Sequence, residues 1–223
     1  MKQSISPILM GLTVLFSVCL VTSNFFETKL VQFGSIITTA GILLFPISYI
    51  VNDVVAEVWG FRRARMVIWI GFAMNFLVIS FCFVAVALPS APFWEGESHF
   101  NYVFGLTPRI AVASLLAFVI GSFLNAFVMS KMKLSSHGRH FSVRAVASTL
   151  VGESADSLIF FPIAFYGIVP NNELMIMVLT QAGMKTLYEI IVLPLTNVIV
   201  RVIKEKERTD VYDKGIKYNI FGL

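Results

Sequence analysis

Acidic side chains stand inside an apolar stretch, residues 144–167, that is long enough to cross a bilayer. Glu153 and Asp156 lie near its middle, and Ser157 follows directly. The spacing i, i+3, i+4 places these three side chains on one face of a helix. A carboxylate at the centre of a membrane costs about 2.5–3.5 kcal/mol on insertion scales, so each needs a partner, a proton or a ligand. The spacing therefore predicts a polar site at membrane depth.

A second polar face lies on the last apolar stretch, residues 174–203. There Lys185, Tyr188 and Glu189 share one side of a helix, and Lys185 matches the depth of the two acids. One interpretation is an ion pair between helices, from Lys185 to Glu153 or Asp156, that fixes the packing. However, three acids against one base leave a surplus of negative charge, which stabilises packing poorly. Such a surplus favours a cationic or multiply donating ligand, or protonation coupled to transport.

The composition indicates a membrane protein with several helical spans. Of 223 residues, 57% are hydrophobic and only 13% are charged. The basic residues lie in short blocks between apolar stretches, which argues against a nucleic-acid partner despite the net charge of +4. Cys19 and Cys82 both lie inside apolar stretches and form no disulfide or metal pattern. Because no phosphate loop or catalytic motif is present either, we expect no cofactor and no enzyme activity.

We expect an all-α protein in which residues 1–223 form a single transmembrane domain. Its six predicted helices cover residues 7–26, 35–52, 64–88, 109–129, 145–169 and 174–203, followed by a cytoplasmic tail, 204–223. Fourteen of the 17 Lys and Arg residues then fall on one side of the bilayer, two fall on the other, and Lys185 lies within it. This bias places both termini in the cytoplasm.

Six helices divide into two sets of three with opposite orientation. The second helix of each set carries a similar phrase, FPISY at residues 45–49 and FPIAF at residues 161–165. One interpretation is a 3+3 inverted repeat, and the other is two independent proline kinks.

Further polar residues occur at the edges of the predicted helices and within them. Asp53 and Glu57 stand at i and i+4 just before the arginine block Arg62, Arg63 and Arg65. This arrangement predicts either a clamp of salt bridges at the cytoplasmic face or a gate that opens when the pairs exchange partners.

Two asparagines lie within predicted helices. Asn75 and Asn125 either hydrogen-bond between helices or offer an amide to a ligand. Asn125 also ends a row of small residues at steps of four, with Ala113, Ala117 and Gly121, which predicts tight helix packing.

Several long segments resemble the bacterial queuosine-precursor transporter family, formerly grouped under vitamin uptake transporters. The resemblance covers residues 7–213. It is carried by FPISYIVNDVVAEVWGFRRARMVIWIGF, PRIAVASLLAFVIGSFLNAFVMSKMK, RAVASTLVGESADSLIFFPIAFYG, KTLYEIIVLPLT and the tail phrase DVYD. It implies a multi-pass protein of the bacterial inner membrane that imports 7-deazaguanine bases (preQ0, preQ1 or queuine) for tRNA modification. The sequence departs from the family at Trp59, where Tyr is more usual, and at Glu153, where Gln is frequent, so Asp156 carries more weight.

The resemblance also carries over a set of polar motif residues. They fall on Asp53, Glu57, Arg109, Asn125, Arg144, Glu153, Asp156, Ser157, Lys185 and Glu189. A deazaguanine presents N1–H and an exocyclic amine side by side, and one carboxylate accepts both. Its flat ring favours aromatic stacking.

These considerations give two groups of expected functional residues. The expected substrate-binding residues are Asp156, Glu153, Ser157, Asn125, Lys185, Glu189, Tyr188, Asn75 and Phe160. The expected gating or salt-bridge residues are Asp53, Glu57, Arg62, Arg65, Arg109 and Arg144. We expect Asp156, helped by Glu153 or Glu189, to bind the base edge.

A different class of protein is an alternative. The chain could be the substrate-binding subunit of an energy-coupling-factor importer for a vitamin-like or purine-like compound, because its size and six helices suit that role. Such subunits usually carry an Ala-xxx-Ala surface on the first helix, which residues 8–20 lack. The expected partners are a small-molecule substrate and the lipid bilayer, and a homo-oligomer is compatible with the sequence.

Overall fold

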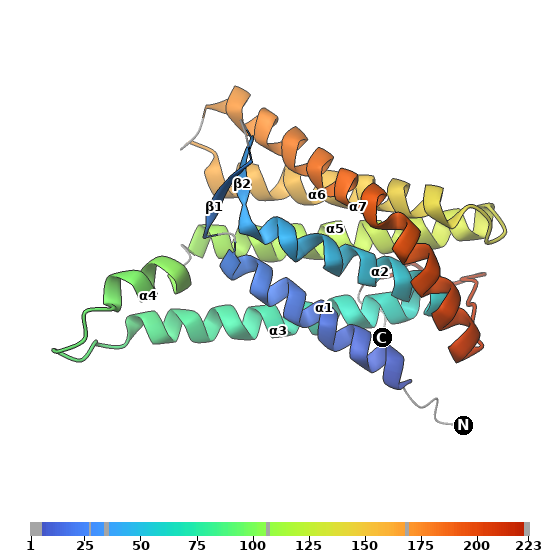
Figure 1. Ribbon diagram of the computed structural model, residues 1–223, viewed down its shortest axis with the longest axis horizontal. Coiled ribbons are helices and arrows are strands. Elements are labelled where there is room, and N and C mark those ends of the chain that lie inside the picture. Colours follow the sequence, from blue (N-terminus) through green and yellow to red (C-terminus); the bar gives the residue numbers. More distant parts are fainter. Residues whose placement is uncertain (1–5, 27, 34–35, 106–107, 168–169, 221–223) are drawn as a thin grey trace.

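The computed structural model describes residues 6–26, 28–33, 36–105, 108–167 and 170–220 and shows a bundle of long helices (Figure 1). The elements are α1 (Pro7–Phe26), β1 (Leu30–Phe33), β2 (Ile36–Thr39), the 3₁₀ helix η1 (Ala40–Leu43), α2 (Phe45–Trp59), α3 (Phe61–Ala87), α4 (Glu97–Phe104), α5 (Pro108–Ser135), α6 (Phe141–Phe165) and α7 (Asn171–Glu207).

Within the described residues, six helical segments are long and apolar enough to cross a membrane. The predicted all-α fold with six spans is therefore confirmed. Large apolar side chains such as Phe81 and Ile191 point outward, with 65% and 69% of their surface exposed, as a lipid-facing surface requires. The β-hairpin and α4 lie at one end of the bundle, and the start of α1 and the end of α7 lie toward the other (Figure 1).

The predicted second span, 35–52, is wrong at both ends. Ile36–Thr39 instead form strand β2, which pairs antiparallel with β1 in the register Leu30 opposite Thr39. A run of β-branched residues favours a strand at this point. Helix α2 begins only at Phe45 and continues to Trp59. Asp53 and Glu57 therefore lie inside α2, and both side chains are buried.

The two prolines of the shared phrases occupy different positions in their helices. Pro46 lies in the first turn of α2, where a missing backbone N–H breaks no helical hydrogen bond, whereas Pro162 lies inside α6 near its end. The shared phrase therefore does not support an inverted repeat.

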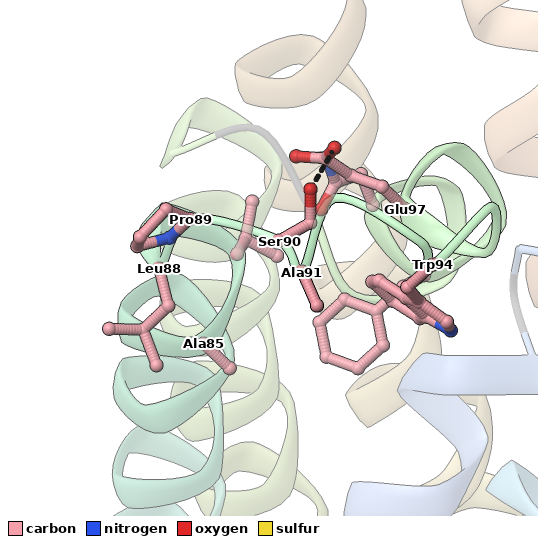
Figure 2. Close-up of a pocket in the computed structure, with 10 residues that line it drawn as sticks. Ala85, Leu88, Pro89, Ser90, Ala91, Trp94 and Glu97 are labelled. Atoms are coloured by element: carbon pink, nitrogen blue, oxygen red, sulfur yellow. Dashed lines mark hydrogen bonds between the residues drawn. The ribbon is translucent and has the colours of Figure 1, made fainter.

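The predicted loop over residues 89–108 contains α4 and a surface pocket of about 250 Å³. Figure 2 shows this pocket between the end of α3 and α4, with the Ser90 hydroxyl donating to Glu97 at 2.7 Å. Phe93 and Trp94 are both exposed here, as side chains of the headgroup layer are expected to be. No buried acid lines the pocket, so we do not take it as the candidate site.

Helices α2, α5 and α6 meet at two glycines. A Cβ atom added at Gly121 would lie 2.8 Å from the Tyr49 hydroxyl and 2.9 Å from the Gly152 carbonyl oxygen. One added at Gly152 would lie 2.8 Å from the Cβ of Asn125. The predicted tight packing of the small-residue row is confirmed here, since only glycine allows these backbones to approach so closely.

We predict that Gly121→Ala lowers the free energy of unfolding by about 1–3 kcal/mol, because the added methyl group forces the helices apart. Gly183→Ala is the matched control, since no atom lies within 4 Å of a Cβ at that position. The control should be neutral or slightly stabilising. Thermal unfolding of the two purified variants in detergent checks both statements. Equal stability of the two variants would contradict the packing argument.

Candidate functional site

Lys185 of α7 is the centre of a buried charge cluster. Its Nζ atom lies 2.8 Å from Oε2 of Glu153 and 3.4 Å from Oδ2 of Asp156, both on α6. It also lies 4.0 Å from the centroid of the Phe45 ring, at the start of α2. The exposed fractions of Glu153, Asp156 and Lys185 are 0%, 7% and 8%. The sequence therefore placed the two acids and the base together correctly.

Polar atoms without a hydrogen-bond partner gather on the helices around this cluster. In the described part of the chain they include Tyr49 Oη, Asn52 Oδ1, Thr149 Oγ1, Ser157 Oγ and both carboxylate oxygens of Glu189. Buried polar atoms nearly always have a partner, so such a concentration is unusual. It indicates a site that a polar ligand or protons complete.

Two asparagines connect α2 to α5 beside this cluster. Asn52 donates from Nδ2 to Oδ1 of Asn125 at 2.8 Å and to the carbonyl oxygen of Ser122 at 3.1 Å. Asn125 is fully buried and lies against Gly152 of α6, one residue before Glu153. Of the two expected roles of Asn125, the hydrogen bond between helices is present in the structure.

Asp53 and Glu189 form a second layer of acids. Asp53 is fully buried, and its oxygens face the Ser148 hydroxyl at 3.3 and 3.4 Å. Glu189 is 1% exposed and lies on α7 one turn after Lys185. Electrostatic repulsion from Glu189 reaches both Asp53 and Glu153, so the three acids face one interior region.

A second charge cluster surrounds Glu57, near the other end of α2. Arg144 donates through both terminal nitrogens to the two carboxylate oxygens, and Lys204 donates to Oε1 at 2.6 Å. Lys133 lies 3.8 Å from the same oxygen. The expected pairing with the arginine block is therefore wrong. Gly60, with φ of 80°, separates α2 from α3, and the side chain of Glu57 faces α5, α6 and α7 instead.

The C-terminal segment belongs to this cluster. Asp210 accepts from Lys133 at 2.5 Å and contacts Lys204 at 2.9 Å. Burial alone would raise the pKa of Asp210, but the two lysines outweigh that effect and hold the pKa below its ordinary value. Asp213 accepts from the backbone N–H of Phe61 at 2.8 Å and from the Ser130 hydroxyl. The predicted tail thus packs against the bundle.

The remaining arginines lie apart from both clusters. Arg62 is exposed, and Arg65 donates to the carbonyl oxygen of Asn219 at 2.5 Å. Arg109 donates to the carbonyl oxygens of Ile163 and of Tyr166, the latter at 2.7 Å, and so caps the end of α6. Of the expected gating residues, only Glu57 and Arg144 are paired with each other.

Three other expected site residues lie at the margins or elsewhere. Asn75 accepts from Asn24 of α1 at 2.8 Å and has no recorded contact with the acids. Phe160 stacks edge-to-face on Phe161, one turn along α6 from Asp156. Tyr188 is half-buried against the main apolar core.

Some residues of these clusters escaped the sequence reasoning. Lys133 and Lys204 had been placed in a loop and a tail, but α5 and α7 extend far enough to include both. Tyr49 and Asn52 lie on α2 within the segment FPISYIVND, residues 45–53, which is one of the segments that carry the family resemblance. Their place in that segment is the sequence signal that could have identified them.

Six spans around an acid-rich interior define a helical membrane protein with a polar site at membrane depth. A sequence model of the family described as "Putative vitamin uptake transporter" matches residues 39–199. The chain belongs to this family of membrane transporters, and the resemblance found in the sequence is confirmed.

Curated relatives agree with the family. The chain is 28% identical over 202 residues to a probable queuosine precursor transporter of Bacillus subtilis (strain 168), with 90% of this chain and 88% of that protein covered. It is 31% identical over 156 residues to the queuosine precursor transporter of Escherichia coli (strain K12), with 68% and 66% covered. No solved structure matches the chain significantly.

We predict that Glu57→Gln lowers the free energy of unfolding by about 3–5 kcal/mol, because it leaves Arg144 and two lysines without their shared partner. Glu95→Gln, at an exposed loop position, should change stability by less than about 0.5 kcal/mol. Adding Lys133→Met to Glu57→Gln should recover part of the loss by removing one surplus charge. Chemical or thermal unfolding in detergent measures each step, and a stable Glu57→Gln single variant would refute the cluster's role.

Proposed function

We propose that this chain imports queuosine precursors, 7-deazaguanine bases such as preQ0 and preQ1, across the bacterial inner membrane. The functions named for the relatives and the family membership support a transporter of this kind. The site itself supports a polar, nitrogen-rich substrate. One ammonium, Lys185, faces the two buried carboxylates of Glu153 and Asp156, so the acids outnumber the base.

Asp156 binds the base edge in this proposal. Its contact with Lys185 at 3.4 Å is longer than the 2.8 Å contact of Glu153, so Lys185 releases Asp156 more readily. A freed carboxylate accepts N1–H and the exocyclic amine together. Ser157, whose hydroxyl has no partner among the described residues, offers a further hydrogen bond beside it. Phe160 on the next turn offers a ring for stacking.

The observation that carries the proposal is the combination of burial and unpaired polar atoms between α2, α6 and α7. Both Glu153 and Glu189 are shielded from solvent, so the site is closed in this conformation. Substrate reaches it when α6 and α7 separate from α2 on one side of the membrane. The Glu57 cluster lies on the side where α5, α6 and α7 carry most of their basic residues, and this side faces the cytoplasm in the proposal.

We predict that Asp156→Asn lowers the affinity for preQ1 about 10- to 100-fold, because the amide offers one acceptor and one donor where two acceptors are needed. Glu97→Gln, an exposed acid of α4, should transport at the unchanged rate. Uptake of labelled preQ1 into cells and binding to the purified protein measure the effect. Uptake by Asp156→Asn equal to that of the parent protein would exclude this assignment.

Transport by the purified chain alone separates an importer from a substrate-binding subunit. We expect proteoliposomes that contain only this protein to take up labelled preQ1. Tight binding without uptake would instead favour the subunit of an energy-coupling-factor importer, which needs an ATP-driven partner.

A further inference from the structure

Glu189 is a buried acid that the proposed binding of the base does not use. It is 1% exposed, and neither carboxylate oxygen has a hydrogen-bond partner among the described residues. Within the part of the chain that the structure describes it forms no ion pair, whereas Glu57, Glu153 and Asp156 each contact a basic side chain. Among these four acids, Glu189 alone is both deeply buried and without a cation.

Burial without a hydrogen-bond partner among the described residues makes the ionised form of Glu189 unfavourable. From α6 it faces Glu153 and from α2 it faces Asp53, and Glu153 in turn lies near Asp156 and Tyr49. On the same helix, Lys185 lies one turn away, and its ammonium contacts the carboxylate of Glu153. Arg144 and Lys204 contact Glu57 instead. An unpaired carboxylate in such a region is costly, and a proton removes the cost.

We infer that Glu189 carries the proton that couples import to the proton gradient, an inference that rests on the proposed transport function. In the outward-open form its carboxylate takes one proton from water outside the cell. The closed bundle holds the neutral acid. When the site opens inward, the O–H bond breaks, the proton passes to cytoplasmic water, and the carboxylate remains.

The position of Glu189 on α7 explains how proton and substrate stay linked. The same helix carries Lys185, one turn away, whose ammonium holds the carboxylates that bind the substrate. A movement of α7 therefore changes the surroundings of both groups together. Asp53, another buried acid for which the described residues provide no ion pair, lies on α2 rather than on the helix of Lys185, and the Ser148 hydroxyl lies 3.3 and 3.4 Å from its oxygens.

The test compares two transport modes of Glu189→Gln, which imitates the neutral acid. Proteoliposomes are given an acidic exterior, two pH units below the interior, with the membrane potential clamped at zero. Labelled preQ0 is the probe, since it lacks the aminomethyl group of preQ1, whose own charge would respond to the gradient. For one proton per substrate, the parent protein accumulates preQ0 up to about 100-fold.

We expect Glu189→Gln to lose this accumulation, with an internal concentration about equal to the external one, because the amide binds no proton. Exchange of external labelled preQ0 for internal unlabelled preQ0, without a gradient, should persist. Glu189→Asp, which keeps a titratable group, should retain gradient-driven accumulation. Glu205→Gln, an exposed acid on the same helix, should behave as the parent protein does.

Three results would overturn the inference. The first is accumulation of preQ0 by Glu189→Gln at the parental level. The second is the loss of both exchange and accumulation in a folded Glu189→Gln protein. The third is accumulation by the parent protein that is the same with and without the pH gradient. If Glu189→Gln does not fold, absence of accumulation in a folded Glu189→Asp protein decides against the inference. Failure of the proposed function appears separately, as an absence of preQ0 and preQ1 transport in every variant and in the parent protein.

Discussion

The cost of placing charge in a membrane governs this structure. Lys185 is shared by Glu153 and Asp156, and Glu57 is shared by three bases, so most buried charges are compensated by a partner on another helix. These contacts join α2, α5, α6 and α7, and the glycines at the crossing allow the helices to come close enough for them. Charge compensation thus depends on close packing of these helices, and the packing in turn depends on compensation of the charges that it buries.

The two charge clusters divide the interior into regions with different tasks. Around Glu57 the bases outnumber the acids and each charged group of the cluster has a partner, which suits a contact that holds the helices together in this conformation. Around Lys185 the acids outnumber the base, and several buried polar atoms have no hydrogen-bond partner among the described residues. This arrangement suits a site that a polar ligand or a proton completes.

The sequence predicted much of this arrangement, and its errors have a common physical cause. Hydropathy and the spacing of polar residues indicated six spans, the shared face of Glu153 and Asp156, and the ion pair with Lys185. Charged residues at the ends of apolar runs were read as helix ends, so Glu57 and Lys133 were placed outside the bundle. Both are buried because partners far along the chain compensate them, and a local pattern contains no information on such partners.

The long sequence separations in the Glu57 cluster have a consequence for biosynthesis. Glu57 precedes Arg144 by 87 residues and Lys204 by 147 residues. When α2 leaves the ribosome, this carboxylate has neither partner, and the translocation machinery must hold the helix in a watery channel or at the membrane surface. The contacts of Glu57 form only after Arg144 and Lys204 have been synthesised, and Asp210 then joins the same cluster. Charge compensation at Glu57 therefore follows the synthesis of α2 by most of the length of the bundle.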